Sequence, residues 1–162
     1  MAELPRPLAA DEIDTVAALA RTIWQATYPA LIPQAQIDFM LADRYAPARI
    51  RTQLDDAAHC WQVLGAPPHA FAHACLEAGD CKLDKLYVHP VRQRQGCGAA
   101  LIEAVAAWAR AHGATQLRLQ VNRGNRQAIR AYEKNGFAVV EARVFEIGGG
   151  FVMDDYVMRR AL

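Results

Sequence analysis

The stretch VHPVRQRQGCGAAL, residues Val88–Leu101, decides how the second half of this chain folds. A strand is expected over Lys82–Val88, and a helix is expected to begin at Gly96 and Gly98. The loop between them presents several backbone N–H groups at a helix N-terminus, where the partial positive charge favours a phosphate. The two glycines let a ligand approach the main chain closely. The stretch therefore predicts an anion-binding loop.

The common nucleotide-binding motifs do not fit this loop. A dinucleotide fingerprint needs a third glycine near Leu101 and an acidic residue about 20 residues beyond the first glycine, and neither is present. The segment Pro90–Gln95 is also too long for that motif. A P-loop needs Gly-Lys-Ser/Thr, whereas Gly98 is followed by Ala99. What remains is a strand, a loop of amides and a helix start suited to a pyrophosphate.

The segments before this loop predict helices followed by a strand meander. An apolar stripe at helical spacing begins after Asp11, the expected N-cap, and should end at Tyr28, which precedes a proline. Two further helices are expected, beginning near Pro33 and over Ala48–Ala57. Short turns then separate three apolar runs that are expected to be antiparallel strands: Cys60–Leu64, Ala70–Leu76 and Lys82–Val88.

The segments after the loop alternate between helix and strand. They are an amphipathic helix over Gly98–His112, a half-buried strand around Leu117–Val121, a helix over Asn125–Asn135 capped by Asn125, and strands over Phe137–Ile147 and Val152–Met158. This order predicts an α/β (α+β) sandwich, with a mixed, mostly antiparallel central sheet flanked by helices. We find no repeat or linker and expect a single domain over residues 1–162.

Composition excludes several classes of protein. The 162 residues are 53% hydrophobic and 22% charged, with a net charge of +1, which gives no reason to expect a nucleic acid or membrane partner. No apolar stretch is long enough to span a membrane, and the N-terminus lacks a signal-peptide pattern. The four cysteines show neither metal-site spacing nor a paired motif, so we expect free thiols, no metal, and a cytoplasmic location.

One helix face downstream carries a second set of polar groups. Asn125, Ala128 and Tyr132 lie three and four residues apart, so they share one face of the expected helix. The small residue between an amide and a phenol leaves room for a ligand along the helix. A phenol, with a pKa of about 10, can protonate a departing thiolate, whose thiol has a pKa of about 8.5. A helix cap and a half-buried aromatic ring are the alternative interpretation.

These motifs together resemble the GNAT superfamily of acyl-CoA N-acyltransferases. QRQGCGA at Gln93–Ala99 is similar to the family pattern Q/R-x-x-G-x-G/A, and V-x-P at Val88–Pro90 precedes it. NRQAIRAYEKNGF at Asn125–Phe137 follows at the expected distance. The resemblance covers about Ala70–Leu162 and fits more loosely in the N-terminal third. It implies the GNAT fold, acetyl-CoA as acyl donor, and transfer to a primary amine by direct attack in a ternary complex.

The resemblance also implies roles for individual residues. Tyr132 would be the general acid toward the thiolate, and an N–H near Val88 would polarise the thioester carbonyl. Arg130 or Lys134 would reach the 3′-phosphate. The cofactor-binding residues would be Leu86, Tyr87, Val88, Gln93, Arg94, Gln95, Gly96, Cys97, Gly98, Ala99, Asn125, Ala128 and Tyr132. Asp84 is the favoured proton acceptor, with Glu77, His73 or a water chain as alternatives, and Cys97 is not expected to act as a nucleophile.

The acceptor is the less determined half of the site. Trp24, Tyr28 and Phe39 are candidates for an apolar acceptor pocket, and Asp154 and Asp155 for attracting a cationic amine. Core packing and a solvated strand end are the alternative interpretations. We expect a small amine or polyamine acceptor and a monomer or homodimer. The competing hypotheses are a non-catalytic acyl-CoA-binding regulator and an acetyltransferase of protein N-termini or aminoacyl-tRNA.

Overall fold

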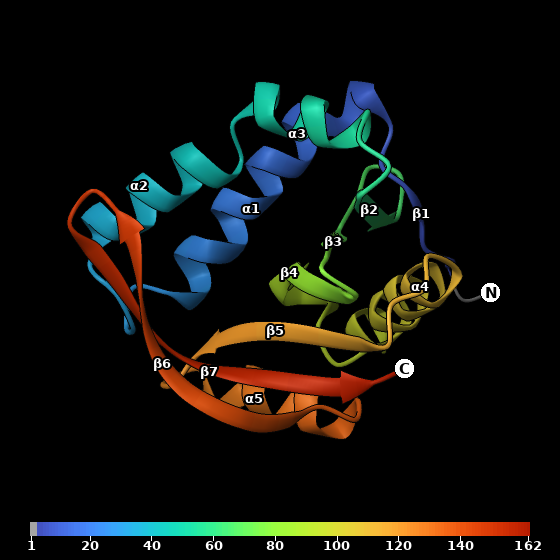
Figure 1. The fold of residues 1–162 in the computed structure, drawn as a ribbon. Coiled ribbons are helices and arrows are strands. Elements are labelled where there is room, and N and C mark those ends of the chain that lie inside the picture. Colours follow the sequence, from blue (N-terminus) through green and yellow to red (C-terminus); the bar gives the residue numbers. More distant parts are fainter. Residues whose placement is uncertain (1–2) are drawn as a thin grey trace.

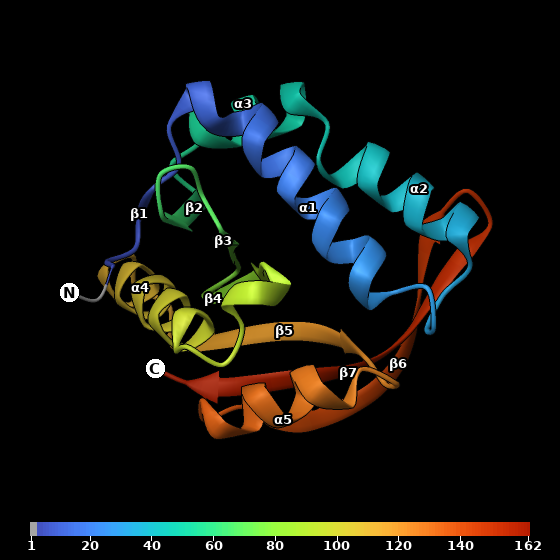
Figure 2. The same cartoon turned by 180° about the vertical axis from the view of Figure 1, so that it is seen from behind.

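A seven-stranded sheet forms the centre of the computed structural model, which describes residues 3–162 (Figures 1 and 2). Its spatial order is β1-β2-β3-β4-β5-β7-β6, and β4 and β5 are the parallel pair in an otherwise antiparallel sheet. The strands are β1 (Arg6–Pro7), β2 (His59–Leu64), β3 (Ala70–Glu77), β4 (Asp80–Val88), β5 (Gln116–Asn122), β6 (Ala138–Gly148) and β7 (Phe151–Ala161).

Five α-helices flank the sheet, α1 to α3 on one face and α4 and α5 on the other (Figures 1 and 2). They are α1 (Ile13–Thr27), α2 (Gln34–Arg44), α3 (Pro47–Leu54), α4 (Cys97–Ala111) and α5 (Arg126–Lys134), with 3-10 turns at Ala10–Glu12 and Pro90–Arg92. No helix within residues 3–162 combines the length and the hydrophobicity needed to cross a membrane.

The predicted fold class is confirmed, and each expected helix and strand is present with ends shifted by a few residues. One local prediction is wrong: Asp11 does not cap the first helix. The chain begins to turn earlier, with Ala9 before the 3-10 turn, because the Glu12 carboxylate accepts the Ala9 N–H at 3.1 Å. The same carboxylate also binds the Arg6 guanidinium at 2.7 Å, which fixes it in place.

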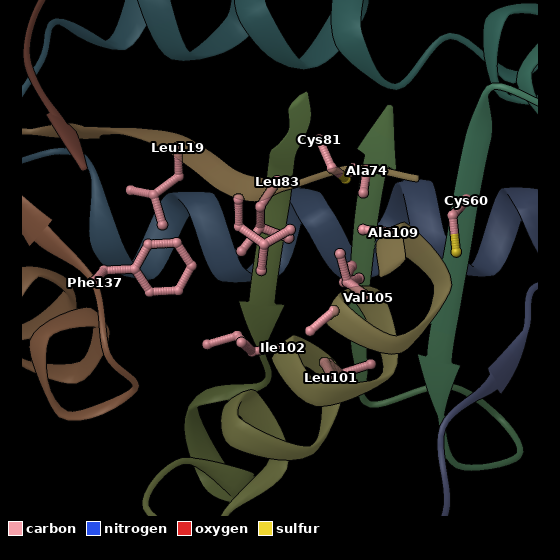
Figure 3. Packing of buried hydrophobic residues seen from close by; sticks show 14 of the residues in the cluster. Cys60, Ala74, Cys81, Leu83, Leu101, Ile102, Val105, Ala109, Leu119 and Phe137 are labelled. Atoms are coloured by element: carbon pink, nitrogen blue, oxygen red, sulfur yellow. The ribbon is translucent and has the colours of Figure 1, made fainter. Parts of the chain in front are cut away.

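Helix α4 covers one face of the sheet with its apolar stripe. Leu101, Ile102 and Val105 are fully buried against small and branched side chains of β3, β4 and β5 (Figure 3). Each such buried side chain contributes about 1.5–3 kcal/mol relative to exposure. This packing anchors the first turn of α4 beside the end of β4.

Helices α1 to α3 cover the opposite face through a second, aromatic cluster. Trp24, buried on α1, packs on Tyr28 with ring centroids 4.5 Å apart and on Tyr87 of β4 at 5.8 Å. Phe71 of β3 contacts both Tyr87 and Tyr45. The aromatic cluster therefore fixes the N-terminal helices directly above the middle of the sheet.

The sheet is divided between β4 and β5. The parallel pairing is limited to Cys81 with Leu117 and Lys82 with Arg118, after which the strands separate. A bulge in β4 lies just beyond these pairs, because Ala74 and His73 of β3 pair with Leu83 and Lys85 and leave Asp84 unpaired. A bulge bends the strand and increases its twist. The second half of β4 therefore has an open edge facing β5.

The β6–β7 hairpin extends beyond the sheet and lies beside α2 (Figures 1 and 2). The Gln36 side chain donates to the Val152 carbonyl at 2.8 Å, and Phe39 packs on Phe151 at 5.5 Å. Gly149, with φ of +62°, lies so close to Phe39 that a Cβ added to the glycine would be 3.0 Å from the Phe39 ring. These contacts join α2 to the hairpin at the edge of the separated strands.

Candidate functional site

A cleft of about 1360 Å³ lies between the separated strands β4 and β5 and continues beneath α1 and α2. Sites for drug-sized molecules are typically about 300–1,000 Å³, so this cleft has room for a long ligand or for two ligands. The β4–α4 loop and α5 line one end, and the α2 face of the sheet lines the other.

The β4–α4 loop presents free amides, as expected. Gly96 is the N-cap of α4 with φ of +83°, and Arg94 is also left-handed at +61°. The first hydrogen bond of the helix runs from Ala100 N–H to Gly96 carbonyl at 3.0 Å, so the N–H groups of Cys97, Gly98 and Ala99 have no acceptor within the helix. Such a turn with converging N–H groups is suited to an anion.

The polar side chains of the loop hydrogen-bond to its own carbonyl groups. Gln93 Nε2 donates to the Val88 carbonyl at 3.3 Å, and Gln95 Nε2 donates to the Val91 carbonyl at 3.4 Å. The Cys97 thiol lies 3.8 Å from the Arg92 carbonyl. These contacts hold the loop while leaving the amides of the first helical turn for a ligand. A Cβ added to Gly98 would meet no atom within 4 Å, so space is open there.

Along the second half of β4, successive backbone N–H groups point alternately toward β3 and toward the cleft. His89 N–H donates to the His69 carbonyl of the β3 side at 2.8 Å. In an antiparallel ladder the next residue to bond in this way is Tyr87, so the N–H groups of Leu86 and Val88 face the cleft. The Tyr87 hydroxyl meets that of Tyr28 at 3.0 Å on the α1 face. Leu86 and Val88 therefore provide the backbone edge, whereas Tyr87 contributes its side chain to the other end.

Helix α5 forms the opposite wall. The side-chain oxygen Oδ1 of Asn125 accepts the Ala128 N–H at 3.4 Å, which confirms the predicted cap and leaves the Asn125 NH₂ group available to a ligand. Tyr132 packs edge-on against Phe137 with centroids 5.8 Å apart. Burial, with a smaller contribution from nearby Tyr28, raises the pKa of the Tyr132 phenol, so the group stays protonated. All three predicted residues of this face line the cleft.

Asp84 stands at the bulge and is surrounded by basic side chains. One carboxylate oxygen accepts from Lys85 Nζ at 2.7 Å and lies 3.2 Å from His73 Nδ1. The other accepts from Arg44 at 3.1 Å and lies 3.5 Å from Lys82 Nζ. Burial alone would raise the pKa of Asp84, but the His73 contact and the neighbouring cations hold it well below its ordinary value.

This geometry does not favour the predicted role of Asp84 as proton acceptor, nor those of the two alternatives. A carboxylate held ionised by several donors retains no proton at neutral pH. His73 is stacked on Trp61 and does not line the cleft, and burial lowers its pKa to about 4 despite the Asp84 contact. Glu77 lies outside the cleft, where it pairs with Arg118.

The acceptor end of the cleft combines aromatic and charged side chains. Trp24, Tyr28 and Phe39 line it, as the sequence suggested. The two neighbouring acidic residues predicted at this end have different environments. Asp154 is exposed and pairs with Arg123 at 3.5 Å, whereas Asp155 is 4% exposed and lines the cleft. Three further polar residues that line this end were not anticipated, because they come from α2, the bulged strand and β5: Arg44, Lys82 and Gln120. Lys85, also unanticipated, is buried and contacts Asp84 without lining the cleft.

Comparison with known proteins gives consistent relatives. Residues 22–137 match the model of the acetyltransferase (GNAT) family. An uncharacterized N-acetyltransferase of Mycobacterium tuberculosis is 35% identical over 156 residues, which cover 94% of this chain and 97% of the relative. A spermidine N(1)-acetyltransferase of Thermoplasma acidophilum is 23% identical, over 92% and 94% of the two chains. The crystal structure of the PaiA N-acetyltransferase of the same organism, in complex with coenzyme A, covers both chains fully with a TM-score of 0.86 at 20% identity.

Proposed function

The chain belongs to the acetyltransferase (GNAT) family and is an acetyl-CoA-dependent acyltransferase, and on this basis we propose that it acetylates a primary amine, with a small amine or polyamine as acceptor. The observation that carries the proposal is the cleft that joins a loop of free amides, an open strand edge and a half-buried phenol. The likeness to a spermidine N(1)-acetyltransferase supports the polyamine class.

The donor end of the cleft fits coenzyme A. The free N–H groups of Cys97 to Ala99 are suited to its pyrophosphate, and the open space at Gly98 lets that group approach the main chain. The open edge at Leu86 and Val88 offers hydrogen bonds to the amides of the pantetheine arm, in the manner of an added strand. Asn125 and Ala128 flank that arm, and Arg130 and Lys134, further along α5, are suited to the 3′-phosphate.

Acetyl-CoA supplies an acyl group on a thiol leaving group, and the chain supplies polarisation and a proton. The Val88 N–H, which faces the cleft, would hydrogen-bond the thioester oxygen as negative charge develops on it. The Tyr132 phenol gives its proton to the departing sulfur. Burial raises the pKa of this phenol and so makes it a weaker acid, but the same burial disfavours a free thiolate and so increases the proton affinity of the departing sulfur.

A thiol-release assay with acetyl-CoA tests the proposal. The acceptors are spermidine, a set of amino acids, an aminoglycoside and peptides with a free N-terminus, and the control omits the amine to measure hydrolysis. We expect amine-dependent release of coenzyme A, greatest with a small amine or polyamine. Coenzyme A binding by calorimetry without release for any amine would instead favour a regulator, and release restricted to peptides would exclude the small-amine proposal. A gel shift with tRNA tests the remaining alternative.

A further inference from the structure

Three carboxylates line the cleft, and two of them are already engaged within the protein. Asp43 of α2 is about half exposed and pairs with Arg49 at 3.2 Å. Asp84 contacts four side chains through its two oxygens, so its lone pairs are occupied within the protein. A substrate ammonium would have to displace Lys85 or Arg44 to reach it. Asp84 is therefore part of the framework of this end, and a cationic substrate needs another acceptor.

Asp155 is the third carboxylate, and among residues 3–162 no ion pair engages it. It lies on β7, opposite Asn122 of β5, and is 4% exposed while lining the cleft. Its Oδ1 atom is buried without a hydrogen-bond partner among the residues that the structure describes. A buried, unpaired carboxylate oxygen is costly, and its presence requires an explanation. A ligand that donates a hydrogen bond at this position would satisfy it.

The charges around Asp155 come from several elements. Arg44 of α2 and Lys82 of β4 line the same cleft as Asp155, and Tyr28 lines this cleft from the end of α1. Asp154 precedes it on β7, and Arg143 of β6 lies opposite in register but is exposed, with its guanidinium over Phe145. Neither nearby cation is within ion-pair distance of Asp155 in residues 3–162. The net effect of burial, opposed by Arg44 and Lys82, is to raise the pKa of Asp155 to about 6.

We propose that Asp155 binds the ammonium form of the acceptor amine and accepts its proton, which makes it the catalytic base of this enzyme. The inference rests on the proposed function, because it requires an amine acceptor in this cleft. An ionised carboxylate facing a cleft is a direct partner for R–NH₃⁺. The cations Arg44 and Lys82 at the same end lower the proton affinity of both the amine and Asp155, whereas burial of Asp155 raises the proton affinity of its carboxylate and so favours the transfer.

The protons balance in this scheme. The ammonium loses one proton to the Asp155 carboxylate and becomes a neutral nucleophile. A bond forms from nitrogen to the thioester carbon, and the carbon–sulfur bond breaks as the sulfur takes the Tyr132 proton. The nitrogen releases its second proton, which restores the Tyr132 phenol, and Asp155 returns its own proton to solvent. Each turnover transfers one acetyl group and releases one proton.

The test compares Asp155→Asn with Asp154→Asn, its neighbour on the exposed side of the same strand. Turnover with acetyl-CoA is measured for each, using spermidine as the amine or, if spermidine is inert, the best amine of the panel. The pH dependence of kcat/KM is recorded from pH 5 to 9, and coenzyme A affinity is measured by calorimetry. Because general-base catalysis contributes about 10²–10⁴-fold, Asp155→Asn should lose that factor in kcat and retain coenzyme A affinity.

The ionisation of Asp155 predicts the direction in which activity changes with pH. Asp155 is competent when ionised, so wild-type activity should fall as the pH drops through about 6, and this limb should be absent in Asp155→Asn. Asp154→Asn should keep both the rate and the profile. A wild-type rate for Asp155→Asn would overturn the inference, and so would an effect confined to KM, because that would indicate that Asp155 binds the amine without accepting its proton. A wild-type enzyme inactive with every amine would instead refute the proposed function.

Carbon-13 NMR provides a readout that does not depend on turnover. The Asp155 carboxyl signal is assigned by its loss in Asp155→Asn and titrated with and without spermidine. An ammonium bound to the carboxylate favours its ionised form, so saturating spermidine should lower the apparent pKa of Asp155. An unchanged titration in the presence of bound amine would contradict the inference.

Discussion

Replacing Asp84 with asparagine should destabilise the fold more than any single surface change. The substitution removes the charge at 2.7 Å from Lys85, whose side chain is 3% exposed, and at 3.1 Å from Arg44. Breaking a buried pair by removing one partner costs about 3–5 kcal/mol, because the remaining charge is left buried. For a chain of this size each kcal/mol lowers Tm by about 2–4 °C, so we expect a decrease of about 6–20 °C.

The matched control is Asp43→Asn on α2. Asp43 also pairs with an arginine, Arg49 at 3.2 Å, but both side chains are about half exposed. Exposed pairs are worth about 0.2–1 kcal/mol, so this variant should stay within about 4 °C of the wild type. Thermal unfolding followed by circular dichroism measures both variants. A stable Asp84→Asn protein that has lost turnover would refute the framework role and restore Asp84 as the base.

The contacts of Asp84 with its basic neighbours also predict a pH dependence of stability. The pKa of Asp84 is lowered in the folded state, so its contribution is complete above the unfolded pKa of about 3.9 and is lost as pH falls toward the folded pKa. The difference in unfolding free energy between wild type and Asp84→Asn should therefore be constant from pH 7 to 5 and shrink below about pH 4. Urea unfolding at each pH measures it. A difference that vanished already at pH 6 would exclude this origin.

Three further predictions concern the donor end. Tyr132→Phe should lower turnover about 10²-fold with coenzyme A affinity retained, and an unchanged rate from pH 6 to 10 would exclude the general-acid role. Gly98→Leu should weaken coenzyme A binding at least tenfold at unchanged Tm, because the added side chain meets open space in the protein; calorimetry that finds equal affinity would place the pyrophosphate elsewhere. Gly96→Ala should cost about 1–2 kcal/mol in urea unfolding, because φ is +83° there, and equal stability would show that the loop relaxes.

The donor end could be predicted from sequence because its features are local. A strand, a glycine-rich turn and a helix start follow one another within Val88–Leu101, and the Asn125 cap with Tyr132 lies on one short helix. Spacing along the chain therefore determines which groups share a face. The wrong cap at Asp11 shows the limit even for local features, because Arg6 and Glu12 form a contact that starts the turn earlier.

The acceptor end could not be predicted in the same way, because its contacts join distant parts of the chain. Asp84 meets Arg44 from 40 residues upstream, and no pattern in either segment indicates the other. Asp154 and Asp155 look equivalent in sequence. They differ because Asp154 lies on an exposed part of β7, whereas Asp155 points to the opposite side of the strand and lines the cleft beneath α1 and α2; strand alternation alone does not say which of the two is covered.

The bulge at Asp84 connects the two ends of the site. Simple alternation would place Asp84 and Lys85 on opposite faces of β4, whereas the extra residue lets both contact His73 on the α1 face. The bulge also follows directly after Lys82, the last residue of β4 that pairs with β5, so the bend begins where the strands separate. The charges gathered around Asp84 stabilise this bend. Deleting Asp84 should therefore restore regular pairing with β3, with Lys85 still opposite His73, and narrow the cleft, with loss of coenzyme A binding as the observable. Retained coenzyme A affinity in the folded deletion variant would show that the strands separate without the bulge.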